Sequence, residues 1–117
     1  MRFLICGSRD WWDRGTILQW IKLHVPPEST VIHGDARGAD RIAGQEAILL
    51  GHAVDVFPAL WNAHGKSAGY IRNQQMLDEG RPDLVVYSHD DLEGSRGTKD
   101  MVSRAMKAGI PVCKGVV

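Results

Sequence analysis

The chain has 117 residues, of which 44% are apolar and 24% are charged, and its formal net charge at pH 7 is zero. This composition is typical of a soluble globular protein, and the length predicts a single domain over residues 1–117. Zero net charge excludes a bulk attraction to nucleic acid or to an anionic membrane, so any anion site must be local. The sequence has neither a leader pattern nor an apolar run near the ~20 residues that cross a bilayer, so we expect a cytoplasmic protein without a membrane partner.

Apolar runs of strand length alternate along the chain with segments whose apolar residues recur at helical spacing. Strands are predicted at residues 3–6, 30–33, 53–57, 83–88 and 110–113. Helices are predicted between them, the first carrying Trp20 as a core residue and the others at residues 39–50, 67–79 and 98–108. Continuous apolar strands joined by helices indicate a parallel sheet covered on both faces. We therefore predict an α/β protein with a three-layer, Rossmann-like, doubly wound fold and a mostly parallel sheet of about five strands.

Three loops that follow predicted strands combine small residues with an arginine: "GSRD", "HGDARGAD" and "GSRGT". Such loops lie at the carboxyl ends of parallel strands, where ligands bind in doubly wound folds. Glycine permits close approach of the backbone, helix-opening amides bind anions, and arginine adds a two-pronged contact to phosphate. Thr98 stands where an N-cap or a phosphate-binding hydroxyl is expected before the last helix. The alternative for the first loop is a tight turn in which Arg9 and Asp10 pair on the surface, and the alternative for the last loop is a flexible loop with a helix cap. The predicted ligand-binding residues of these loops are Gly7, Ser8, Arg9, Asp10, Gly34, Arg37, Gly38, Asp40, Ser95, Arg96, Gly97 and Thr98.

Patterns for common cofactors are missing from the sequence. The first strand is not followed by Gly-x-Gly-x-x-Gly, and there is no Gly-x-x-x-x-Gly-Lys-Ser/Thr loop, which argues against dinucleotide chemistry and ordinary nucleoside-triphosphate hydrolysis. The acidic segment at residues 89–93 is interpreted as an exposed loop rather than a magnesium site. Cys6 and Cys113 fall in predicted strands as small buried hydrophobes, which fits a reducing compartment. We expect no cofactor and no metal.

Six segments occur in the same order as in a known group of proteins: "GSRDWWD", "VIHGDARGADRIA", "FPALW", "GKSAGYIRNQQML", "RPDLVVYSH" and "GSRGTKDMVSRAMKAGIPV". Over nearly its whole length the chain resembles the small YspA-like proteins, a YpsA-related branch of the SLOG superfamily. The resemblance implies a Rossmann-like domain that binds a nucleotide or a nucleotide-derived ligand, with the two Gly-Ser-Arg turns meeting at one pocket. It also implies homo-oligomers, although no interface can be read from the sequence.

The superfamily includes the Lonely Guy phosphoribohydrolases, whose motifs Pro-Gly-Gly-x-Gly-Thr-x-x-Glu and Arg-Lys-x-x-Met this chain matches only in part. Arg72 and Met76 match the second motif, and Asn73 replaces its lysine. Met101 stands where the catalytic glutamate is expected, and Asp100 is the nearest carboxylate. The resemblance therefore implies ligand binding by Arg72 and Asn73, with Arg72 and Asp100 as candidate catalytic residues. Breaking an N-glycosidic bond needs a carboxylate, and the spacing gives no means of choosing among Asp100 and its alternatives, Asp10, Asp35 and Asp40.

Three functions follow as hypotheses. The first is a module that senses or sequesters a small phosphorylated nucleotide-like partner, and the second is a phosphoribohydrolase acting from the same pocket. The third, nucleic-acid binding like that of the superfamily member DprA, is disfavoured by the zero net charge and the lack of a basic tract with interleaved aromatics. Trp11, Trp12 and Trp61 are expected near the pocket mouth, where one of them stacks on a base, unless they fill the core or a subunit interface.

Overall fold

The sheet of the protein has five strands that all run parallel. The computed structural model describes residues 1–116. The strands are β1 (Arg2–Gly7), β2 (Thr30–His33), β3 (Ala53–Val56), β4 (Leu84–Ser88) and β5 (Val112–Lys114). Their order in the sheet is β3-β2-β1-β4-β5. The predicted α/β class and Rossmann-like architecture are confirmed, and the sheet is entirely rather than mostly parallel.

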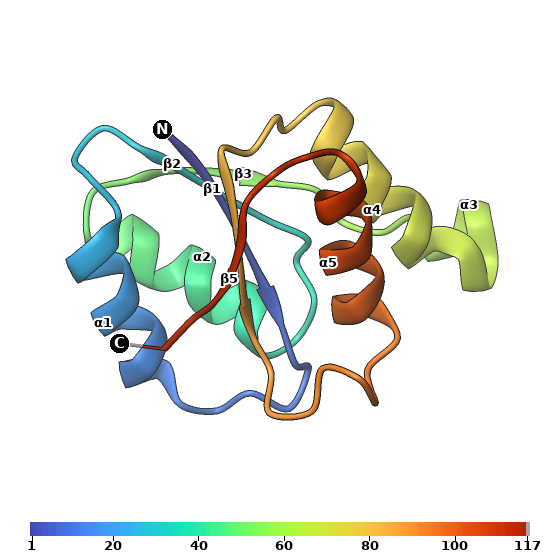
Figure 1. Ribbon diagram of the computed structural model, residues 1–117, viewed down its shortest axis with the longest axis horizontal. Coiled ribbons are helices and arrows are strands. Elements are labelled where there is room, and N and C mark those ends of the chain that lie inside the picture. The colour runs from blue at the N-terminus through green and yellow to red at the C-terminus, as the bar shows by residue number, and fades with distance from the viewer. Residues whose placement is uncertain (117) are drawn as a thin grey trace.

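Helices cover both faces of the sheet (Figure 1). One face carries α1 (Arg14–His24) and α2 (Ala39–Leu49), and the other carries α4 (Ala68–Asp78) and α5 (Gly97–Lys107). The segment before α4, for which no helix was predicted, contains the short helix α3 (Trp61–His64) and the 3-10 turn η1 (Gly65–Ser67). In Figure 1 α3 projects beyond the end of α4, on the side of the molecule away from α1. None of the helices in residues 1–116 combines the length and the apolar character needed to cross a membrane.

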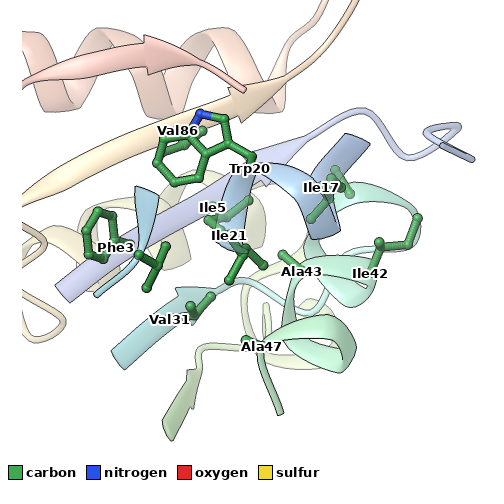
Figure 2. Close-up of a cluster of buried hydrophobic side chains, with 12 residues drawn as sticks. Phe3, Ile5, Ile17, Trp20, Ile21, Val31, Ile42, Ala43, Ala47 and Val86 are labelled. Atoms are coloured by element: carbon green, nitrogen blue, oxygen red, sulfur yellow. The ribbon is translucent and has the colours of Figure 1, made fainter. Parts of the chain in front are cut away.

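Apolar side chains form one cluster on each face of the sheet. On the α1 and α2 side, Trp20 is 5% exposed and meets Phe3 edge to face, with ring centroids 6.2 Å apart, as predicted for a core residue (Figure 2). On the α4 and α5 side, Met76 and Met101 pack against the sheet. Burying both faces of every central strand explains why the strands are continuous apolar runs in the sequence.

Two side chains differ in burial from what their polarity indicates. On α4, the apolar Ile71 is 45% exposed, whereas the polar Asn73 is buried. The amide of Asn73 is satisfied by hydrogen bonds to α5, which makes its burial favourable. Cys6 is buried as expected, whereas Cys113 lies on the short outer strand β5 and is only partly buried.

Both outer strands of the sheet are short, because β3 has four residues and β5 has three. Each carries a charged residue, Asp55 in β3 and Lys114 in β5. Asp55 accepts a hydrogen bond from the Arg2 guanidinium at 2.5 Å. The two longest strands, β1 with six residues and β4 with five, lie in the interior of the sheet.

The winding direction of the chain reverses between β1 and β4. The chain leaves β1 for α1 on one face of the sheet, and it leaves β4 for α5 on the other face. The two strands end side by side, with Gly7 paired to Ser88. Their following loops diverge from this point and leave a crevice, which is where ligands bind in open parallel sheets.

Candidate functional site

A cavity of about 650 Å³ opens at the carboxyl ends of β1 and β4. It draws its walls from both Gly-Ser-Arg turns, from the start of α2 and from α4. Most of the residues predicted from the sequence line it: Gly7, Ser8, Arg9, Asp10, Asp40, Arg72, Asn73, Ser95, Arg96, Gly97 and Thr98. Topology thus brings together two turns that lie near opposite ends of the chain.

The first turn is held in place by backbone hydrogen bonds on both sides. The Ser8 amide donates to the Ser88 carbonyl at 2.8 Å, and the Ser8 carbonyl accepts from the Ala39 amide at 3.0 Å. Gly7 lies between these groups, where a Cβ would come within 2.8 Å of the Ala39 methyl and 2.9 Å of the Ser88 carbonyl carbon. Gly38, at φ +85°, packs against the backbone of the same turn. Only a residue without a side chain fits position 7, so the glycine of this motif is dictated by close packing.

The second turn is capped by Ser95, and the expectation that Thr98 is the N-cap of α5 is wrong. The Ser95 hydroxyl accepts from the Lys99 amide at 3.0 Å and donates to the Leu92 carbonyl at 2.9 Å. Helix α5 begins at Gly97, one residue earlier than predicted, which makes Thr98 a buried residue of the first helical turn. Among the described residues, no group accepts a hydrogen bond from the backbone amides of Gly97 and Thr98. These two amides therefore offer hydrogen bonds and partial positive charge to an anion at the cavity.

The arginines of the two turns carry no internal counter-charge. Within residues 1–116, neither Arg9 nor Arg96 forms an ion pair, and both are exposed. The Arg9 guanidinium lies 5.9 Å from the ring centre of Trp61. By contrast, Arg37 donates to the Asp10 carboxylate at 3.0 Å and to the Arg9 carbonyl at 3.1 Å. The alternative considered from the sequence, a surface pair of Arg9 with Asp10, is not formed among the described residues, because Asp10 pairs with Arg37. The guanidinium groups of Arg9 and Arg96 remain available at the cavity.

Three of the predicted ligand-binding residues, and the catalytic candidate Asp100, lie outside this cavity. Gly34 and Arg37 line a neighbouring hollow of about 350 Å³, together with Asp35 and Arg41. Gly38 lines neither space, because it packs beneath the first turn. The loop after β2 therefore supports the cavity wall more than it faces the cavity.

Arg72 and Asn73 join the cavity wall to the surrounding elements. Arg72 donates to the carbonyl of Gly34 at the end of β2, and its Nε donates to the Asn73 side-chain oxygen at 3.0 Å. Burial lowers the pKa of Arg72, opposed by the nearby negative charge of Asp40. The Asn73 amide nitrogen donates to the Gly97 carbonyl at 3.2 Å. The two adjacent residues thus fix α4 to β2 and to the start of α5.

Asp100 faces a second hollow, which it shares with the predicted residues Ser95 and Arg96. It lines a hollow of about 690 Å³ between α4 and α5, where Arg96 and Lys99 are also found. Its carboxylate accepts from Asn73 at 3.0 Å and from the Arg104 Nε at 2.8 Å. Through Asn73 it contacts the wall of the main cavity, but it does not line that cavity itself.

Asp40 is the buried carboxylate of the cavity. It is 4% exposed, and its Oδ2 accepts from the amides of Gly34 at 3.0 Å and Ala36 at 3.4 Å. Burial raises the pKa of Asp40 to about 6, opposed first by the positive charge of Arg72 and then by the backbone amides. Ionisable groups with perturbed pKa values inside a cavity are candidates for function.

Known families and sequences were compared with the chain. Residues 1–64, which run from β1 through α3, match the profile of the YspA, cpYpsA-related SLOG family. The chain belongs to this family. It is also 40% identical over 119 aligned positions to the Gene 61 protein of Mycobacterium phage D29, an alignment that includes 95% of this chain and 93% of that protein. Membership of the SLOG family is consistent with a nucleotide-related role in binding or processing.

The three tryptophans expected near the mouth of the SLOG cavity have different surroundings. Trp61 lines the cavity and is 49% exposed. Trp11 packs against the core cluster on the α1 side, with its indole N–H donating to the Asp13 carbonyl at 3.0 Å. Trp12 is 84% exposed and does not line the cavity. Of these three tryptophans, Trp61 is the one that lines the cavity.

Two polar residues of the SLOG cavity, Tyr70 and His89, were not among the residues singled out from the sequence. Lys66, which the stretch GKSAGYIRNQQML offers together with Arg72 and Asn73, also lines the cavity and lies in η1. Tyr70 precedes Asn73 by three positions in α4, a spacing that places residues on one side of a helix and is a signal that links the two. His89 follows β4 directly, and its Nδ1 accepts from the Asp91 amide at 2.9 Å. Among residues 1–116, no three His, Cys, Asp or Glu side chains are grouped closely enough to hold a metal ion.

Proposed function

We propose that this SLOG protein binds a phosphorylated nucleotide or nucleotide-derived molecule in the cavity at the ends of β1 and β4. The observation that carries the proposal is the meeting of Arg9 and Arg96 at one cavity, each without an ion-pair partner in residues 1–116. A phosphate placed between them receives charge-assisted hydrogen bonds from both guanidinium groups. The first amides of α5, at Gly97 and Thr98, contribute further donors.

The rest of the cavity suits the remainder of such a ligand. Its volume of about 650 Å³ lies within the range of roughly 300 to 1,000 Å³ that is common for small-molecule sites. The ring of Trp61 borders the cavity beside Arg9, so a base bound there stacks on the indole while the phosphate contacts the guanidinium. The buried Met76 and Met101 form an apolar part of the wall.

Calorimetric titration with a panel of nucleoside monophosphates and diphosphates tests the proposal. Arg9→Ala and Arg96→Ala should each weaken binding by about 5- to 150-fold, because a charge-assisted hydrogen bond is worth about 1 to 3 kcal/mol. Lys22→Ala is the control, since Lys22 is an exposed cation on α1 outside the cavity. Unchanged affinity in both arginine variants, or an equal loss in Lys22→Ala, would contradict the proposed phosphate site.

The binding role is proposed without chemical conversion of the ligand, as in a sensor or a sequestering module. The hydrolase alternative uses the same cavity, with Arg72 and Asp100 as catalytic residues. It is favoured by the position of Arg72 in the cavity wall, whereas Asp100 reaches that wall only through its hydrogen bond to Asn73. Chromatography of each nucleotide after incubation with the protein separates the two roles. An intact nucleotide supports binding alone, and a released base supports hydrolysis.

A further inference from the structure

Asp40 lies on the buried side of the cavity, and the cations lie on its exposed side. Asp40 is 4% exposed, whereas Arg9 and Arg96 are both exposed. The neighbours of Asp40 in the cavity wall include the buried Cys6 and Met76, and also Arg72, whose positive charge acts on Asp40. Two of the Arg72 donors, Nε and Nη1, already bind the oxygens of Asn73 and Gly34. The cavity thus has two cations without ion-pair partners at its outer end, and a carboxylate beside a hydrogen-bonded arginine at its inner end.

Other carboxylates near the cavity are already paired with arginines. Asp10 is bound to Arg37, and Asp100 is bound to Arg104. No side chain of the described residues forms an ion pair with Asp40, whose hydrogen-bond donors are backbone amides. A carboxylate has about four acceptor positions, and the amides of Gly34 and Ala36 both bind Oδ2. Asp40 therefore keeps acceptor capacity for a donor that enters the cavity.

This arrangement fixes the direction in which a nucleotide enters, given the proposed function on which the inference rests. A phosphate at the inner end would face the Asp40 carboxylate, and like charges in a buried site repel strongly. A phosphate at the outer end instead meets Arg9 and Arg96. The inner end then receives a neutral group that donates hydrogen bonds, and the sugar hydroxyls of a ribonucleotide are such donors.

We propose that Asp40 accepts a hydrogen bond from a ribose hydroxyl and makes the cavity selective for ribonucleotides over deoxyribonucleotides. A site built to bind a hydroxyl rejects the analogue that lacks it, because its buried polar group is then left without a partner. Asp40 is in this sense a specificity-determining residue. Its bonds to Gly34 and Ala36 hold the carboxylate in position for this role.

The test compares the four common ribonucleoside 5′-monophosphates with their 2′-deoxy and 3′-deoxy counterparts by calorimetric titration of the wild-type protein. We expect at least one deoxy series to bind about tenfold or more weakly than the ribonucleotides, in line with the loss of a hydrogen bond to a charged acceptor. Asp40→Asn, which retains one side-chain oxygen, should reduce this preference to about threefold or less. Asp78→Asn is the control, because Asp78 is an exposed carboxylate on α4 outside the cavity, and it should leave the preference unchanged.

Failure of this inference is distinguishable from failure of the proposed function. Equal binding of ribonucleotides and both deoxy series overturns the role of Asp40 but leaves nucleotide binding intact. The same preference in Asp40→Asn as in the wild-type protein also overturns it. If no nucleotide of any series binds, the proposed function and this inference fall together.

A measurement on the wild-type protein covers the case in which Asp40→Asn does not fold. Carbon-13 NMR of the labelled Asp40 carboxyl follows its titration with a ribonucleotide or the matching deoxynucleotide bound. A hydrogen bond to the ionised form lowers the pKa of a carboxyl, so the pKa should be lower in the ribonucleotide complex than in one of the deoxy complexes. Identical titration in all complexes overturns the proposal, because the phosphate, which is common to all of them, cannot produce a difference.

Discussion

Burial of Asp40 makes the stability of the protein depend on pH in a direction opposite to that of most carboxylates. Burial raises the pKa of Asp40 from 3.8 to about 6 in the folded chain. Below pH 3.8 the carboxyl is protonated in both the folded and the unfolded state, and it has no effect on stability. Between the two values the unfolded chain has ionised while the folded chain has not, so folding takes up a proton and stability falls as the pH rises. Above about pH 6 the loss is complete.

The size of this effect follows from the two pKa values. They differ by about two pH units, and each unit corresponds to about 1.4 kcal/mol, so ionised Asp40 reduces the free energy of unfolding by roughly 3 kcal/mol. Asp40→Asn removes the ionisation. Relative to the wild-type protein, this variant should therefore gain roughly 3 kcal/mol of stability when the pH is raised from below 3.8 to above 6.

Urea unfolding of both proteins, followed by tryptophan fluorescence at about pH 3.5 and about pH 8, measures this difference. The quantity of interest is the change with pH in the stability difference between Asp40→Asn and the wild-type protein. Effects of the asparagine that do not depend on pH cancel in this quantity. The titrations of ionisable groups that both proteins contain cancel as well. Asp13 is one such group, since its hydrogen bonds to Thr16 lower its pKa in both chains. A stability difference that stays constant with pH, or that falls as the pH rises, would refute the reasoning.

Two further substitutions test the close packing of the first turn and the role of the indole at the cavity. Gly7→Ala should lower the free energy of unfolding by about 1 to 3 kcal/mol in urea titrations, because the added Cβ meets the backbone of Ser88. Gly97→Ala should change the free energy of unfolding by less than about 1 kcal/mol, because no atom lies within 4 Å of its added Cβ. Similar losses in the two variants would contradict the packing explanation. Trp61→Ala should weaken nucleoside-monophosphate binding by about 5- to 150-fold in calorimetry, as expected for loss of base stacking, while Trp12→Ala leaves it unchanged. The stacking role is wrong if Trp61→Ala binds as tightly as Trp12→Ala.

The sequence predicted which edge of the sheet carries the arginine-bearing turns. Alternating strands and helices predict a parallel sheet, and the carboxyl ends of parallel strands share one edge, so all three loops are expected there. The order of elements does not specify which strands are neighbours, and the meeting of Arg9 and Arg96 at one pocket was implied by the family resemblance. In the structure, β1 and β4 are neighbours, and the winding reverses between them.

Side-chain surroundings were harder to predict, because they depend on three-dimensional neighbours. An aspartate in the first turn of a helix is usually an exposed favourable charge, and nothing in the residues around Asp40 distinguishes it from Asp100. In the structure Asp40 is buried under the loop after β2, whereas Asp100 pairs with Arg104. Similarly, the capping role fell to Ser95 rather than Thr98 because helix α5 begins one residue earlier than its sequence pattern indicated.

The short outer strands have a consequence for how the protein behaves when concentrated or newly synthesised. An exposed sheet edge offers free amides and carbonyls on which another chain can grow a β-structure, and aggregation begins at such templates. In this fold the two templates are four and three residues long, and each carries a charge, Asp55 on one and Lys114 on the other. An incoming strand must therefore desolvate a charged group for the sake of a few hydrogen bonds. The fold thereby disfavours the addition of further strands at both edges of its sheet.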